Sequence, residues 1–297
     1  MQICRIIYHR NRLTTTGAPT ILFLHGILRG RGFERVALHY APLLRQLLAK
    51  SPADTRILVP EFEGLFSELN EEPKSLVPGS VAGPVGNFIL KDLKEPVPVI
   101  AYSFGAFLLT KLLASNSELI PFLSRVVLVA PVIPKSVIDE NPDHLTDLPT
   151  QIIAGTKDNL TNRDVDLRRW FPRAEFALIQ GGTHYGFFLP SPADTRSASK
   201  TSCSQQQREA SMAIADFLGW DTRWLPVRFA RLRITEVAED GNMIDLTSLY
   251  WNALMRAFHF RKVRLLSVKD PRRGIDLIVS GLPLYRRIMI WVFSRIQ

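Results

Sequence analysis

The sequence is poor in cysteine. Cys4 and Cys203 are the only two among 297 residues. Two cysteines cannot build a disulfide framework or a four-cysteine zinc site, and they give no sign of an oxidising compartment. The apolar run at the N-terminus is too short for the core of a signal peptide, and no small-residue cleavage site follows it. We therefore expect a cytoplasmic protein that keeps its N-terminus.

Motifs for metals and cofactors are also missing. The sequence contains no His-Glu-x-x-His, no paired Cys-x-x-Cys, no Gly-x-x-x-x-Gly-Lys and no strand-linked Gly-x-Gly-x-x-Gly. We predict chemistry without a metal or cofactor. Hydrophobic residues make up 46% and charged residues 22% of the chain, which excludes extended disorder and collagen-like classes. The length allows one large domain with an appendage.

Positive charge is present in excess, and it is unevenly placed. Residues 221–297 contain 14 Lys and Arg against 7 Asp and Glu, so they carry +7 of the total net charge of +9. A basic C-terminal quarter favours an anionic partner such as a lipid surface or a nucleic acid. No nucleic-acid motif accompanies the arginines, so we do not expect nucleic-acid binding.

Residues 1–220 alternate short apolar runs with longer amphipathic ones. This pattern is typical of an α/β protein with a doubly wound, mostly parallel sheet covered by helices on both faces. The expected strands are Ile3–Tyr8, Thr20–Leu24, Arg56–Val59, Val97–Ala101, Val126–Ala130, Thr150–Ile153 and Glu175–Ile179. The expected helices are Glu34–Lys50, Val85–Leu93, Phe104–Ala114 and Gln207–Leu218. Functional loops should follow the carboxyl ends of the strands.

Residues 221–297 differ in character and are predicted to form a small basic α+β appendage. Two hairpin-like pairs have their turns near Glu239–Asn242 and Asp270–Gly274, and a helical stretch follows each. Two long loops, Glu61–Pro84 and Leu189–Gln206, lie within the first 220 residues. Loops of this length are often lids or binding loops.

A serine lies where a buried strand should run directly into a helix. The strand Val97–Ala101 is followed by Tyr102, Ser103, Phe104 and Gly105. A sharp turn at Ser103 needs small neighbours two residues away on either side, and Ala101 and Gly105 satisfy this need. Such a turn exposes the hydroxyl and aims the first amides of the helix at a developing oxyanion.

A serine needs a histidine to accept its proton, and the histidine needs an acid to orient it. Asp158 follows the strand Thr150–Ile153, and His184 follows the strand Glu175–Ile179. His25 and Gly26 follow the strand Thr20–Leu24, which places the amide of Ile27 as a second oxyanion donor beside that of Phe104.

Together these segments resemble the α/β-hydrolase family over about residues 1–220. The resemblance rests on LFLHG at 22–26, AYSFG at 101–105, GTKD at 155–158 and GGTHYGFF at 181–188, in the order nucleophile, acid, histidine. It implies Ser103 as nucleophile, Asp158 as orienting acid, His184 as general base, and Ile27 and Phe104 as oxyanion-hole amides. Ala101 stands where glycine is commoner, and the short connection before Thr150 leaves no room for a helical cap.

The resemblance favours an esterase or lipase-like serine hydrolase. The same triad also serves thioesterases, carbon–carbon bond hydrolases and acyltransferases, and a hydrolase fold can act as a binding scaffold without turnover. His144 is the rival for the base, and Asp164 and Asp166 are the rivals for the acid. His25 is expected to be structural and to bond to the backbone.

The segment Leu282–Gln297 has a broad apolar surface that an arginine pair interrupts. Its apolar run is too short to span a membrane. One interpretation is a helix docked on the rest of the protein. The other is peripheral contact with anionic lipid, with Trp291 and Phe293 at the headgroup boundary and Arg286 and Arg287 facing phosphates. The sequence does not determine the oligomeric state.

Overall fold

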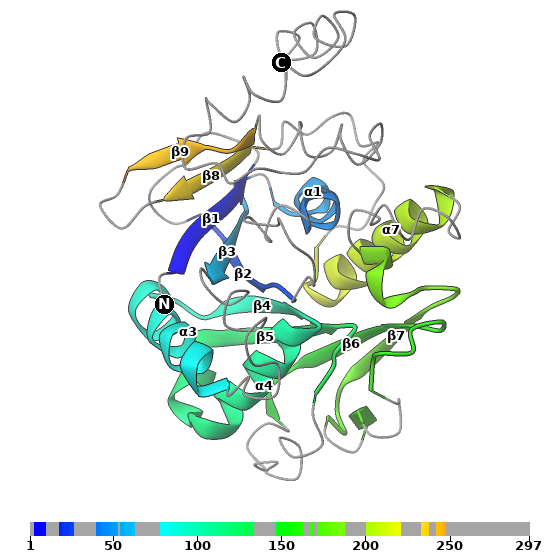
Figure 1. Ribbon diagram of the computed structural model, residues 1–297, viewed down its shortest axis with the longest axis horizontal. Coiled ribbons are helices and arrows are strands. Elements are labelled where there is room, and N and C mark those ends of the chain that lie inside the picture. The colour runs from blue at the N-terminus through cyan, green and yellow to red at the C-terminus, as the bar shows by residue number, and fades with distance from the viewer. Residues whose placement is uncertain are drawn as a thin grey trace, which may run out of the picture.

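The computed structural model describes residues 3–9, 18–26, 40–52, 54–62, 78–133, 147–162, 167–168, 171–187, 200–220, 233–237 and 242–247. Within these residues the centre of the molecule is one nine-stranded sheet with the strand order β7-β6-β5-β4-β2-β3-β1-β8-β9 (Figure 1). Strands β7, β6, β5, β4, β2 and β3 pair in parallel with one another, whereas β1 is antiparallel to both β3 and β8, and β8 is antiparallel to β9. The predicted fold class is confirmed.

The strands are short and mostly buried, as expected in the middle of an α/β protein. Their bounds are β1 (Ile3–His9), β2 (Thr20–Leu24), β3 (Arg56–Phe62), β4 (Val97–Tyr102), β5 (Leu123–Val129), β6 (Thr150–Gly155), β7 (Glu175–Ile179), β8 (Arg233–Val237) and β9 (Met243–Asp245). Each strand predicted in residues 1–220 is present, and β2 and β7 have the predicted bounds.

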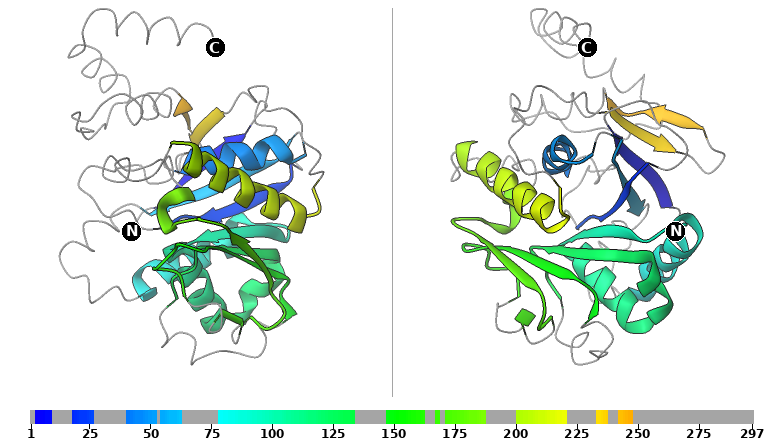
Figure 2. Two further views of the ribbon diagram at one scale, coloured as in Figure 1. Left: turned by 90° about the vertical axis from the view of Figure 1, so that its right-hand side faces the viewer. Right: turned by 180° about the vertical axis from the view of Figure 1, so that it is seen from behind.

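Helices cover both faces of the sheet (Figure 2). On one face α1 (Ala41–Lys50) packs beside α7 (Lys200–Phe217). On the other face α3 (Pro78–Asp92) packs beside α4 (Phe104–Ser115) and the 3-10 helix η2 (Ser117–Phe122). The sheet is therefore wound on both sides, with a separate core on each.

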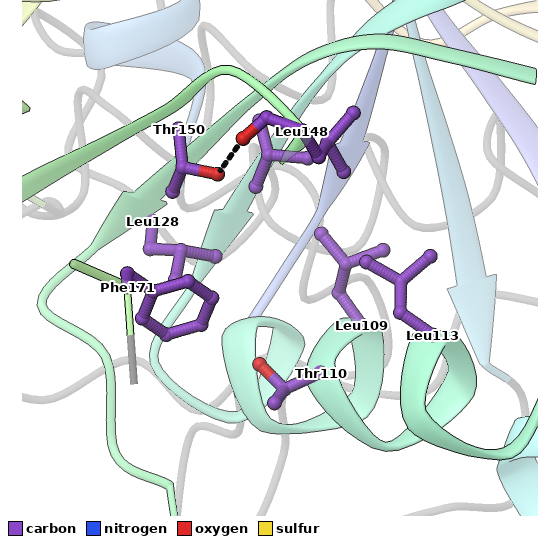
Figure 3. A pocket seen from close by; sticks show the side chains of 8 residues that line it. Leu109, Thr110, Leu113, Leu128, Leu148, Thr150 and Phe171 are labelled. Carbon is purple, nitrogen blue, oxygen red and sulfur yellow. Dashed lines mark hydrogen bonds between the residues drawn. The ribbon is translucent and has the colours of Figure 1, made fainter. Parts of the chain in front are cut away.

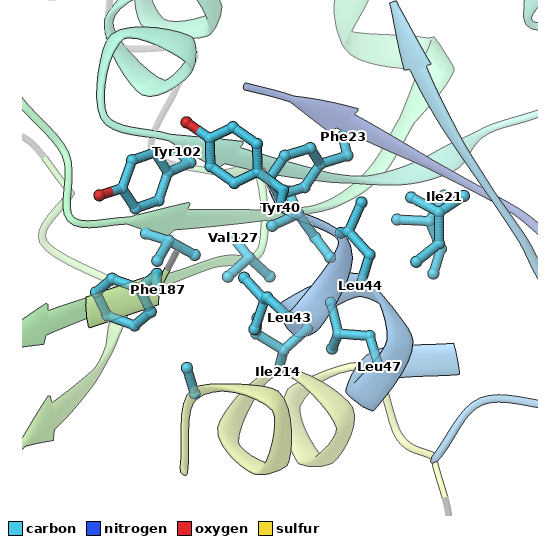
Figure 4. Packing of buried hydrophobic residues seen from close by; sticks show 14 of the residues in the cluster. Ile21, Phe23, Tyr40, Leu43, Leu44, Leu47, Tyr102, Val127, Phe187 and Ile214 are labelled. Atoms are coloured by element: carbon cyan, nitrogen blue, oxygen red, sulfur yellow. The ribbon is translucent and has the colours of Figure 1, made fainter. Parts of the chain in front are cut away.

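The first core lies under α1 and α7 (Figure 4). Helix α1 directs its leucines toward the sheet, where they meet aromatic rings from β2, β4 and η4 (His184–Phe187). The helix α7 adds Ile214 to the same cluster. Because a fully buried leucine contributes about 1.5 to 3 kcal/mol, this packing holds α7 firmly against α1 and the sheet.

The second core lies under α3 and α4. Helix α4 is buried along almost its whole length, because the sheet, α3 and η2 surround it. A helix that is apolar on all sides is typical of such an enclosed position. The start of this helix, which is the part closest to Ser103, is therefore rigidly placed.

The predicted starts of two helices were wrong. Helix α3 begins at Pro78 rather than at Val85, and α7 begins at Lys200 rather than at Gln207. A proline is tolerated in a first helical turn, and Pro84 is accommodated inside α3. The first turns of α7 are rich in Ser, Thr and Gln, so no apolar periodicity indicates them. Both predicted long loops are correspondingly shorter.

The described residues after 220 continue the sheet. Strands β8 and β9 form the first of the two predicted hairpins, and β8 pairs antiparallel with β1. Ile234 and Leu246 enter the first core. The second predicted hairpin and the segment Leu282–Gln297 lie outside the described residues, and the boundary at residue 220 stays a prediction. None of the helices in the described part of the chain is long and apolar enough to cross a membrane.

Candidate active site

Ser103 occupies the sharp turn between β4 and α4 that the sequence predicts. Its φ of 50° and ψ of −111° lie in a region that few non-glycine residues adopt. Its amide donates to the carbonyl of Val129 at 3.0 Å, and its carbonyl accepts from the amides of Ala106 and Phe107. These bonds from β5 and α4 hold the strained turn, since strain of this kind persists only where the surroundings enforce it.

Gly105 allows α4 to approach the end of β2. A Cβ atom at this position would lie 2.2 Å from the carbonyl oxygen of Leu24 and 2.9 Å from that of His25. Both are backbone atoms that cannot move aside cheaply. The requirement for a glycine at position 105 therefore arises from the close packing of α4 against the end of β2. This close approach brings Ser103 beside the segment Leu24–Gly26. Ala101, on the strand side, is completely buried.

His184 joins Ser103 to Asp158. Its Nε2 lies 2.9 Å from Ser103 Oγ, and its Nδ1 lies 2.9 Å from Asp158 Oδ2. The His184 side chain is 6% exposed and that of Asp158 is fully buried. The structure thus brings together the three side chains predicted from the sequence, each at the carboxyl end of a different strand.

The carboxylate of Asp158 has a full set of donors. The amides of Leu160 and Thr161 donate to Oδ1 at 2.9 and 3.0 Å, and the Thr161 hydroxyl donates to Oδ2. Burial raises the pKa of this carboxyl, but the hydrogen bonds from His184 and Thr161 outweigh burial, so the pKa lies below its ordinary value. Asp158 is therefore ionised at neutral pH.

Asn162 ties the loop that follows β5 to the loop that carries Asp158. Its side-chain amide accepts from the amide of Ile133 at 2.6 Å and donates to the carbonyl of Ile133 at 2.9 Å. Its own amide donates to the carbonyl of Pro131. Sequence reasoning missed Asn162, because a link between two loops leaves no local pattern.

His25 and Gly26 form a buried, hydrogen-bonded unit with Tyr40. The Nδ1 of His25 lies 2.9 Å from the carbonyl oxygen of Gly26, which can only accept, so Nδ1 carries the proton. Burial lowers the pKa of His25 to about 4, although the bond to Gly26 acts in the opposite direction. The amide of Gly26 donates to the Tyr40 hydroxyl at 2.9 Å. His25 bonds to the backbone as expected, whereas the contact of Tyr40 was not foreseen.

Two side chains hold the main chain at His184. The hydroxyl of Tyr102 donates to the carbonyl of His184. From α7, the side-chain amide of Gln206 bonds both the amide and the carbonyl of Thr183, the residue before His184. The sequence contains no signal for the contact of Gln206, which falls in a stretch predicted to be a loop.

The remaining predicted residues are not described. Ile27, the second predicted oxyanion donor, lies outside the described residues. So do the rival residues His144, Asp164 and Asp166, and the lipid-contact candidates Arg286, Arg287, Trp291 and Phe293. Phe104 is the first residue of α4, where an amide has no acceptor in the preceding turn of the helix.

A small apolar pocket lies away from Ser103, between α4, β5 and β6 (Figure 3). Its lining includes two threonines, but the hydroxyl of Thr110 donates to the carbonyl of Ala106 and that of Thr150 donates to the carbonyl of Leu148. The surface of the pocket is almost entirely apolar. Among the residues that the structure describes, no group of three His, Cys, Asp or Glu side chains is arranged to hold a metal ion.

Comparison with known proteins gives similarity in structure only. No family model matches the sequence, and no curated protein matches it. A predicted CIB-like hydrolase from Thermoplasma acidophilum has a similar structure, with a TM-score of 0.50 at 12% sequence identity, over 73% of this chain and 96% of that chain. A lipase-esterase related protein from Clostridium acetobutylicum has a TM-score of 0.48 at 13% sequence identity, over 73% of this chain and 100% of that chain. An alpha/beta hydrolase enzyme from the metagenome of lagoon sediments of Mar Chica, Morocco, has a TM-score of 0.44 at 17% sequence identity, over 62% of this chain and 87% of that chain.

The chain has the α/β-hydrolase fold. The order of its parallel strands, the turn at Ser103 and the first of these structures agree on this. Within the α/β-hydrolase fold the three grouped side chains follow in the expected order of serine, aspartate and histidine. The fold by itself does not specify a reaction, because unrelated functions share it.

Proposed function

We propose that this protein is a serine hydrolase that cleaves carboxylic esters. The observation that carries the proposal is the continuous chain of hydrogen bonds from Ser103 Oγ through His184 to Asp158, with both links at 2.9 Å. A hydroxyl, an imidazole and a buried carboxylate in this sequence of contacts form the constellation that activates a serine.

In the proposed reaction His184 Nε2 takes the proton of Ser103 as Oγ attacks the ester carbonyl carbon. The negative charge that develops on the carbonyl oxygen is stabilised by the amide of Phe104 at the positive end of α4. The tetrahedral intermediate collapses, the bond to the alcohol oxygen breaks, and His184 gives its proton to the departing alcohol. An acyl group then remains on Ser103.

Water completes the cycle. His184 takes a proton from the water as its oxygen attacks the acyl carbon, and it returns this proton to Ser103 Oγ as the carboxylic acid leaves. Asp158, held ionised by its donors, keeps the Nδ1 proton of His184 in place and stabilises the imidazolium that forms in each half-reaction.

The test is labelling with a fluorophosphonate probe, followed by hydrolysis of p-nitrophenyl esters of increasing acyl length. We expect the wild-type protein to label and to hydrolyse at least one ester, and the folded Ser103→Ala variant to do neither. A wild-type protein that is folded but neither labels nor hydrolyses any ester would overturn the proposal in favour of a binding scaffold. Labelling without ester hydrolysis would move the search to thioesters and carbon–carbon bonds.

A further inference from the structure

The loop that carries His184 contains two adjacent glycines. It connects the end of β7 at Ile179 with the start of η4 at His184, and it contains Gly181, with a φ of +69°, and Gly182. Glycines leave the backbone free to adopt many conformations. The position of the His184 ring therefore depends on contacts made by this loop.

One contact comes from the loop that carries the acid. The amide of Lys157 donates to the carbonyl of Gly182 at 2.8 Å. This bond holds the loop on the side of Asp158 but leaves Thr183, the next residue, to be held from elsewhere.

Gln206 holds Thr183 from the opposite side. Its Oε1 accepts from the amide of Thr183 at 3.1 Å, and its Nε2 donates to the carbonyl of Thr183 at 2.7 Å. Gln206 is only 5% exposed. The amide and the carbonyl of Thr183 belong to the two peptide groups on either side of its Cα, so one planar side-chain amide constrains both groups, which a single bond cannot do.

Gly186 makes room for this contact. A Cβ atom at position 186 would lie 1.8 Å from Gln206 Oε1 and 2.4 Å from its Cδ. The amide of Gln206 therefore occupies the space that any other residue at 186 would fill. It touches the chain on both sides of His184.

The anchor for Gln206 is the first core. Gln206 belongs to α7, whose Ala210, Ile214 and Phe217 are buried against α1 and the sheet. A rotation or shift of α7 would expose apolar surface, so the helix is a stiff support for the side chain. Packing far from the serine is thereby transmitted to the histidine.

We propose that Gln206 is a positioning residue that keeps His184 Nε2 within hydrogen-bond distance of Ser103 Oγ. This inference rests on the proposed serine hydrolase function. Gln206 would act by fixing the main chain of Thr183. Loss of the side chain should lower the rate of the chemical step rather than weaken substrate binding, because a small displacement of the base reduces proton transfer.

The first experiment compares Gln206→Ala with Gln205→Ala in the full-length protein. Gln205 lies on the same helix turn, is exposed, and bonds only Glu209 of α7 among the contacts described, so it is a matched control. For Gln206→Ala we expect the rate of fluorophosphonate labelling and the kcat for a p-nitrophenyl ester to fall by about 10- to 100-fold, with KM within about twofold. Gln205→Ala should match the wild type.

The second experiment uses Gln206→Glu and a pH profile. A protonated carboxyl group has one donor and one acceptor, so it can reproduce both bonds to Thr183. A carboxylate has no donor, so one of its oxygens would face the carbonyl oxygen of Thr183 without a hydrogen bond. The ratio of the variant's kcat to that of the wild type at each pH removes the pH effects that the two proteins share. We expect this ratio to rise at least several-fold from pH 8 to pH 5. A role confined to folding would shift the melting temperature and leave the ratio unchanged.

The outcomes separate the two proposals. A wild-type protein that neither labels nor hydrolyses esters overturns the hydrolase function and this inference with it. A wild-type protein that labels, while Gln206→Ala labels equally fast, overturns only the role of Gln206. If Gln206→Ala does not fold, the Gln206→Glu profile decides, and a ratio that is constant with pH contradicts the inference.

Discussion

At the scale of single residues, the donors around Asp158 determine what a substitution there would do. In Asp158→Asn the amides of Leu160 and Thr161 would keep the amide oxygen at the position of Oδ1. The amide nitrogen would then face His184 Nδ1 and favour the tautomer with the proton on Nε2. A protonated Nε2 of His184 could no longer accept the proton of Ser103. We therefore expect kcat to fall on the order of 10³- to 10⁴-fold with little change in KM.

The matched control for this substitution is Asp147→Asn. Asp147 pairs with Arg173 at 2.9 Å, but both side chains are about three-quarters exposed, so the pair contributes little. Ester kinetics of the two variants measure the difference. Equal activities of Asp158→Asn and the wild type would remove Asp158 from the proposed mechanism.

His25 should make the stability of the protein depend on pH. Its pKa is about 4 in the folded protein and about 6.5 when exposed, so the unfolded chain binds a proton that the folded one does not. The free energy of unfolding should therefore decrease as the pH falls from about 6.5 to 4, by about 3 kcal/mol from this group at the lower end.

Urea unfolding of the wild type and of His25→Asn at pH 7 and at pH 4 measures this contribution. The free energy of unfolding of the wild type should fall by about 3 kcal/mol more than that of the variant between the two pH values, because the variant has no imidazole at position 25 to protonate. All other titratable groups are the same in the two proteins, so their contributions cancel from the difference. Parallel losses in the two proteins would show that His25 is not kept neutral by burial.

At the scale of elements, the crossing of α4 over the end of β2 depends on one missing side chain. Gly105→Ala would place a Cβ atom 2.2 Å from the carbonyl of Leu24, so the helix or the strand would have to move. We expect a loss of more than about 3 kcal/mol in the free energy of unfolding, or failure to fold. Ester hydrolysis should fall in any protein that folds, since the turn at Ser103 would shift with the helix.

Gly83→Ala is the control, because Gly83 is an exposed residue of α3 whose added Cβ would meet no atom from another part of the chain within 4 Å. There the substitution should change the free energy of unfolding by no more than about 1 kcal/mol, because alanine favours a helix more than glycine does but its Cβ crowds the ring of the following Pro84. Thermal melts of both variants give the comparison. Similar melting temperatures would mean that the close approach at Gly105 is not a constraint.

At the scale of the whole molecule, the sheet extends beyond the part that resembles a hydrolase. Strand β8 pairs with β1, and Ile234 and Leu246 are buried in the same core as α1 and α7. The segment after residue 220 therefore contributes to the core that supports the candidate active site.

Truncation after Trp220 should for this reason destabilise the remaining chain. Strand β1 would lose β8, one of its two antiparallel partners, and Ile6 and Tyr8 would lose part of their cover. We expect a melting temperature lower by several degrees and a greater tendency to aggregate. An appendage that folds independently would leave the melting temperature unchanged, and calorimetry of the two chains distinguishes the cases.

Much of the fold was predictable because its signals are local. Short apolar runs predict buried strands, and the order of Ser103, Asp158 and His184 at strand ends predicts that they meet. The starts of α3 and α7 were not predictable in the same way, since Pro78 and the polar residues from Lys200 onward carry no apolar period. No local pattern therefore marks where these two helices begin.

The sequence by itself determined the α/β class, the sharp turn at Ser103 and the three side chains of the candidate triad, because these depend on residue type and on position along single strands. Only the tertiary structure decided which side chains bond the loops around the candidate triad. Asn162, Tyr40 and Gln206 each bond backbone that lies far away in the sequence, through one side chain. The physical reason is that a bond between distant segments depends on where the core places both of them, and no local pattern records that.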